Sequence, residues 1–224
     1  MVYKRGRALA FSDIRTLLLF AQSPEEVSQV FRTVTRTRGL VVTLRLPDGL
    51  DVNPLVDYWT AGFPDADTRP LLEAAAARDS VTELDVSHLL PALARRRLYT
   101  YPTLDQAVNG RLPDCHWTSL NFFRNTPKAY YLDTRLAASE LLSEYVPVSA
   151  PYRFGDVLTF ISGDSVLHSC VFIADDIVYT KNGENVLAPW VLQRMDDVMA
   201  IYQTDASVRI QGYRLKPEFR NTQR

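Results

Sequence analysis

The stretch that decides the fold is residues 155–181, with the sequence GDVLTFISGDSVLHSCVFIADDIVYTK. Its apolar residues recur with a period close to two, and turn-forming residues interrupt them at 162–164 and at 175–176. The pattern predicts three strands, over residues 157–162, 166–174 and 177–181. Because the connections are too short for a crossover, the strands are expected to pair antiparallel as a meander.

Upstream of this stretch the apolar period is that of a helix. Pro113 and Asp114 mark a helix start, with Asp114 as the N-cap and Cys115 in the first turn. A second helix is expected to begin after Asp133 or Thr134. The order of helix, helix and antiparallel meander predicts an α+β fold.

Cys115 is a candidate nucleophile because of its position at the predicted helix start. A thiol there faces unsatisfied backbone N–H groups and the positive end of the helix dipole. Both favour the thiolate, which is the form that attacks a carbonyl carbon. The sequence therefore predicts an activated cysteine at this position.

A cysteine hydrolase also needs an imidazole that takes and returns a proton. His168 on the second strand is the candidate, and alternation places it on one face with Val166, Cys170 and Phe172. A helix start packed against that face would bring Cys115 to His168.

A third group should hold the tautomer of the imidazole, and its identity depends on the hairpin register. In one register Cys170 pairs with Thr180, and Asn182 then shares the face of His168. In the other register Cys170 pairs with Lys181, and Asn182 points away. The first register is favoured because an amide oxygen accepts a hydrogen bond from imidazole and an ammonium group does not.

The order and spacing of these motifs resemble the NlpC-type papain-like cysteine peptidases. The matching motifs are Asp114-Cys115 at a helix start, FGDVLTF at 154–160, LHSCVFI at 167–173 and IVY at 177–179. The resemblance covers about residues 113–182 and implies a papain-like fold, with the Cys115 helix packed on the meander. It also implies that Cys115 attacks an amide carbonyl while His168 acts first as a base and then as an acid. Many such proteins cleave peptides of bacterial cell walls, and relatives include amidases and acyltransferases.

Two departures from that family leave alternatives open. His116 and Trp117 stand where the family has Ser-Gly, and they could crowd the thiol. The spacing of the third family residue falls near Thr180, whereas Asn182 would complete a Cys-His-Asn set. The prediction is therefore a peptidase or amidase with Cys115, His168 and Asn182, and the alternatives are an inactive papain-like binding module or an acyltransferase.

Composition limits the remaining possibilities. The chain has 224 residues, of which 46% are hydrophobic and 23% charged, and a net charge of −1, so it can bury a large core and shows no preference for nucleic acid. Two cysteines give no disulfide framework, and Cys115-His116 with His168-x-Cys170 lacks the usual zinc spacing, so no metal or cofactor is expected. No apolar run is long enough for a membrane span. No signal peptide is evident, which favours the cytoplasm, although export through a removed signal stays open.

A loop rich in turn-forming residues, 99–113, suggests a boundary within the chain. The sequence therefore predicts a mostly helical region of unassigned role over residues 1–100. The hydrolase domain would cover 101–204 and a polar C-terminal tail 205–224. The expected partner is a peptide or another substrate with an amide bond, with a cell-wall peptide as one candidate, and the oligomeric state stays open.

Overall fold

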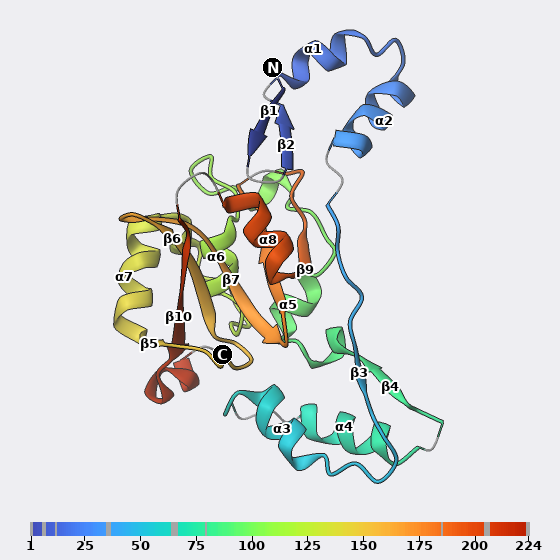
Figure 1. Cartoon of the computed structure of the whole chain (residues 1–224), viewed down its shortest axis with the longest axis vertical. Coiled ribbons are helices and arrows are strands. Elements are labelled where there is room, and N and C mark those ends of the chain that lie inside the picture. Colours follow the sequence, from blue (N-terminus) through green and yellow to red (C-terminus); the bar gives the residue numbers. More distant parts are fainter. Residues whose placement is uncertain are drawn as a thin grey trace.

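The computed structural model describes residues 2–5, 8–11, 13–34, 37–63, 67–78, 80–184, 186–203 and 207–222. Its centre is a six-stranded antiparallel sheet with the order β5–β10–β6–β7–β8–β9 (Figure 1). The six strands are β5 (Tyr145–Val148), β6 (Val157–Ser162), β7 (Ser165–Ala174), β8 (Ile177–Lys181), β9 (Trp190–Arg194) and β10 (Arg209–Leu215). This sheet and the helices around it confirm the predicted α+β class.

Helices and two short hairpins surround this sheet. The α-helices are α1 (Ile14–Leu19), α2 (Pro24–Val34), α3 (Asn53–Thr60), α4 (Thr68–Ala76), α5 (Ala92–Arg97), α6 (Cys115–Leu120), α7 (Thr134–Glu144) and α8 (Met195–Tyr202). Short 3-10 turns cover Val86–Leu89, Leu104–Gln106, Ala129–Leu132 and Pro217–Thr222. The hairpins pair β1 (Val2–Arg5) with β2 (Ala8–Phe11), and β3 (Thr43–Arg45) with β4 (Glu83–Asp85). In the described part of the chain, no helix has the length and apolar character needed to cross a membrane.

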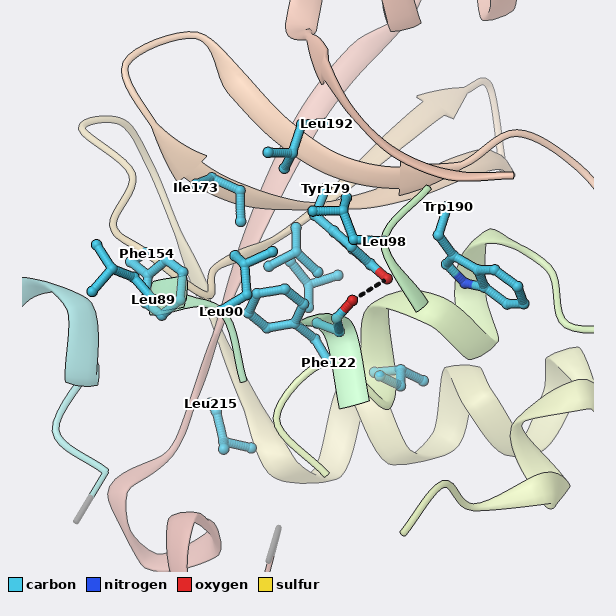
Figure 2. Packing of buried hydrophobic residues seen from close by; sticks show 14 of the residues in the cluster. Leu89, Leu90, Leu98, Phe122, Phe154, Ile173, Tyr179, Trp190, Leu192 and Leu215 are labelled. Atoms are coloured by element: carbon cyan, nitrogen blue, oxygen red, sulfur yellow. Dashed lines mark hydrogen bonds between the residues drawn. The ribbon is translucent and has the colours of Figure 1, made fainter. Parts of the chain in front are cut away.

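Each face of the sheet carries its own apolar layer. On one face, Trp117 and Leu120 of α6 pack with Val157 and Val171 in the larger of the two hydrophobic clusters. Figure 2 shows part of this layer, in which the Tyr179 hydroxyl donates a hydrogen bond of 3.1 Å to the carbonyl of residue 94.

The second layer lies under α8, on the opposite face of the sheet. Val198 and Tyr202 of α8 pack there with Leu158, Phe160 and Cys170. Alternation along β6 and β7 explains the division, because successive side chains of a strand point to opposite faces.

The boundary between an N-terminal region and a separate domain is not observed. Val56, Trp59 and Leu89 belong to the same hydrophobic cluster as Phe154 and Val171 of the sheet region. Residues from the predicted N-terminal region thus complete the core of the sheet, so the division at residue 100 is wrong.

The predicted polar tail over residues 205–224 is also wrong, because β10 lies within it and pairs with both β5 and β6. Its polar side chains have specific partners: Arg214 makes two hydrogen bonds, of 2.8 and 2.7 Å, to the carboxylate of Asp156. The polar sequence did not predict a strand, because the partners of these side chains lie far away in the sequence.

The hairpin registers explain which side chains share a face. Val171 pairs with Tyr179 and Phe172 with Val178, which is the register that the sequence favoured. The turn, Asp175-Asp176, is shorter than expected, and an irregularity between Phe172 and Ala174, just before it, restores the register. A second irregularity, between β6 and β7 beside Leu167, moves Val166 to the face opposite that of His168.

Candidate functional site

Cys115 lies where the sequence predicted it, at the start of α6. The Asp114 carboxylate accepts a hydrogen bond of 2.8 Å from the backbone N–H of Trp117, which confirms Asp114 as the N-cap. The helix packs against β7 and β8. The sequence thus placed the cysteine correctly within its own element.

His168 does not meet Cys115, because α6 covers the other face of β7. Ser169, the next residue along the strand, contacts α6 through a 2.9 Å hydrogen bond between its Oγ and Nδ1 of His116. His168 therefore points toward α8, where its ring stacks on Tyr202 with ring centroids 4.2 Å apart. The predicted pairing of Cys115 with His168 is wrong. Alternation identified the residues that share a face, but it could not say on which face the helix packs.

The groups predicted to orient His168 do lie near it. Its Nε2 is 2.9 Å from Thr180 Oγ1, and Thr180 Oγ1 is 3.5 Å from Asn182 Oδ1. Asn182 in turn donates to Gln193 over 2.8 Å. His168 is completely buried, and this burial lowers its pKa well below the ordinary value. These contacts describe a neutral histidine packed on the α8 face of the sheet.

The thiol of Cys115 is not a thiolate at neutral pH. Burial and, to a lesser extent, the nearby carboxylate of Asp114 together raise its pKa to about 12. Backbone N–H groups of Ser169, His116 and Cys115 itself favour the anion but do not compensate. The predicted activation is therefore wrong: at an exposure of 7%, desolvation outweighs the helix terminus.

Ser169 contacts both Cys115 and the imidazole of His116. Its backbone N–H interacts with the Cys115 thiol and its hydroxyl with His116. Burial lowers the pKa of His116, while the Asp114 carboxylate opposes that shift. A neutral imidazole and a neutral thiol therefore converge on one serine. The sequence analysis treated His116 only as a source of crowding, although its position beside the cysteine was a usable signal.

A buried lysine lies on the same face. Lys181 of β8 donates a hydrogen bond of 2.7 Å to the carbonyl of Gly183, and its ammonium lies 5.7 Å from the ring centre of Trp190. Burial lowers its pKa to about 8, whereas the negative charges of Asp114 and Glu184 act in the opposite direction. Lys181 thus adds a positive charge to the electrostatic environment of the thiol.

A pocket of about 330 Å³ opens beside His116, between α6, α7 and the sheet. His116 and Ser169 contribute to its polar part. Its apolar lining includes Leu120, Ala137, Leu141, Val157 and Val166. The space and its lining suit a small apolar group attached to a polar one.

The chain matches no protein-family model, no curated protein and no solved structure. Across the residues that the structure describes, no group of three or more His, Cys, Asp or Glu side chains is arranged to hold a metal ion. The functional argument therefore depends on the site itself.

Proposed function

We propose that the protein is a papain-like thiol hydrolase that cleaves an amide bond, with Cys115 as the nucleophile and His116 as its base. The observation that carries this proposal is the position of Ser169, which interacts with both the thiol and the imidazole. In this proposal His168 and Asn182 have no part in the chemistry.

The protonation states favour transfer of the proton during attack, without a resting ion pair. The Cys115 thiol gives its proton to Nδ1 of His116, directly or through the Ser169 hydroxyl, as sulfur bonds to the carbonyl carbon. The carbonyl oxygen becomes an oxyanion, which backbone N–H groups at the start of α6 can stabilise. Collapse expels the amine, which takes the proton from His116, and water then hydrolyses the thioester.

The pocket beside His116 suggests the kind of substrate. Because its lining is mostly apolar, it suits a small aliphatic side chain or a short acyl group next to the scissile bond. We therefore propose a peptide or acyl amide as substrate, and a cell-wall peptide is one member of that class.

The test compares hydrolysis of N-acetyl-leucine p-nitroanilide with that of the glycine analogue, which lacks the side chain. We expect a higher kcat/KM for the leucine substrate and loss of activity in Cys115→Ser, with Cys170→Ala as the matched control. His116→Gln should lower kcat about a hundredfold or more. His168→Gln, provided that the variant folds, should leave kcat unchanged. Full activity in Cys115→Ser would exclude the mechanism.

A second candidate is an inactive papain-like binding module. The specific observation in its favour is the burial of Cys115, which leaves the thiol protonated and only 7% exposed. This candidate predicts no acyl-enzyme by mass spectrometry with any acyl substrate, and ligand binding that Cys115→Ala leaves unchanged. An acyltransferase would instead form the acyl-enzyme and pass it to an added amine faster than to water.

A further inference from the structure

A second pocket lies away from Cys115, between α3, the segment before β6 and the end of β10. It has a volume of about 420 Å³, which is enough for a small organic molecule. None of the residues at the Cys115 site lines it. A ligand bound there would thus be independent of the proposed hydrolysis.

Aromatic rings form one wall of this pocket. Phe63 and Phe123 stack with ring centroids 4.2 Å apart, and Phe154 meets Phe123 edge-on at 5.8 Å. A Cβ added to Gly155 would come within 2.3 Å of the Phe123 ring, so the glycine allows the wall to close. Such a wall favours a flat apolar body, above all another aromatic ring.

Charged side chains also line this pocket. They include two aspartates and three arginines, Arg153, Arg214 and Arg220. The charge of Arg214 is already matched, because Asp156 binds it through two hydrogen bonds. In the described portion of the chain, neither Arg153 nor Arg220 has a carboxylate partner for its guanidinium group.

The guanidinium of Arg220 lies against the backbone at Gly62, which has no side chain there. A Cβ on Gly62 would lie 2.3 Å from Nη1 of Arg220, and Gly62 has a φ of +74°, which favours glycine. The guanidinium group can therefore lie directly against this turn. A planar guanidinium group recognises a planar carboxylate through paired hydrogen bonds.

We propose that this pocket binds a small aromatic carboxylate, with its ring against the Phe63, Phe123 and Phe154 wall and its carboxylate on Arg153 and Arg220. The carboxylate could belong to a free aromatic acid or to the C-terminal residue of a peptide, because both present the same chemistry. Asp57, on the same lining, disfavours a ligand with a second negative charge.

The first test uses the unmodified protein and a matched pair of ligands, N-acetyl-L-phenylalanine and its uncharged amide. In ¹⁵N-resolved NMR titrations, the amide signals of Gly62 and Gly155 should shift with the acid. Those of Gly110 and Gly163, which lie outside the pocket, should not shift. Binding of the amide should be at least about tenfold weaker. Equal binding of acid and amide, or no shift at Gly62 and Gly155, would overturn the proposal.

The second test uses Arg153→Gln, Arg220→Gln and the double variant, with Arg135→Gln on α7 as an exposed control. Each single variant should weaken binding of the acid several-fold, the double variant should abolish it, and the control should leave it unchanged. Unchanged affinity in a folded double variant would overturn the assignment. Titrations with 3-phenylpropionate and with a tripeptide ending in phenylalanine distinguish the two sources. Binding of the tripeptide would assign the pocket to peptide C-termini, and binding of 3-phenylpropionate alone would assign it to free aromatic acids.

Discussion

At Cys115, two effects shift the pKa of the thiol in opposite directions: desolvation raises it and the helix N-terminus lowers it. The sequence places the thiol among backbone N–H groups, but the core that closes over it removes water and raises its pKa to about 12. Burial acts in the same way on His168 but lowers its pKa, because the charged form of a histidine is the protonated one. Both residues are therefore neutral at pH 7. His168 belongs to β7 and faces α8, whereas Cys115 belongs to α6 on the other side of that strand.

The raised pKa of Cys115 predicts how alkylation depends on pH. The rate of carbamidomethylation by iodoacetamide should rise about tenfold per pH unit between pH 7 and 10, because only the scarce thiolate reacts. Cys170, which is fully buried, should stay unlabelled in the folded protein. Peptide mass spectrometry measures both rates, and a rate independent of pH above 6 would contradict the assigned pKa.

His168 predicts a loss of stability in mild acid. Its folded pKa lies below the ordinary 6.5, so between those values the unfolded chain binds the proton and the folded chain does not. Its stabilising contribution is complete above pH 6.5 and is lost as pH falls, by about 1.4 kcal/mol per pH unit at most. His116 acts in the same direction.

Urea unfolding between pH 7.5 and 5 measures this slope. His168→Phe keeps a ring beside Tyr202 but cannot titrate, so its slope should be smaller than that of the unmodified protein. His116→Gln is the matched control for the second histidine. A slope that His168→Phe leaves unchanged would mean that His168 is protonated in the folded state.

At the scale of the elements, ion pairs join α7 to the segment that follows α6. The guanidinium of Arg124, only 3% exposed, lies 3.3 Å from Glu140 and 3.5 Å from Glu144 of α7. It also donates a 2.8 Å hydrogen bond to the Tyr131 hydroxyl. The helix thereby forms one wall of the pocket beside His116.

Replacing Arg124 should therefore cost more than replacing an exposed arginine. In Arg124→Met the two glutamates lose a buried partner, and we expect the free energy of unfolding to fall by about 3 kcal/mol. Arg135→Met, on the exposed side of α7, should change it by less than about 0.5 kcal/mol. Similar losses in the two variants, measured by chemical denaturation, would argue against the network.

At the scale of the whole molecule, segments that are far apart in the sequence contribute to one hydrophobic core. Strand β10, from the end of the chain, lies between β5 and β6, while Val56 and Trp59 of α3 pack beneath the sheet. No fragment that ends before residue 209 contains the complete sheet.

This topology predicts that residues 101–204 do not fold alone. The fragment lacks β10, which leaves the paired edges of β5 and β6 open, and it lacks the α3 side chains of the core. We expect the full chain to unfold cooperatively, and the fragment to aggregate or to lack dispersed NMR signals. A fragment that melts cooperatively at the temperature of the full chain would contradict the shared core.

By itself the sequence determined the local structure: the cap at Asp114, the three strands over residues 157–181 and the β7–β8 register that gathers Thr180 and Asn182 around His168. Those features follow from hydrogen bonds and alternation within a few residues, which a local pattern encodes. Only the tertiary structure decided that α6 covers the Ser169 face of β7, that β10 enters the sheet and that burial keeps Cys115 protonated. Each of those outcomes depends on packing between segments far apart in the chain, where desolvation and side-chain fit act and periodicity carries no information.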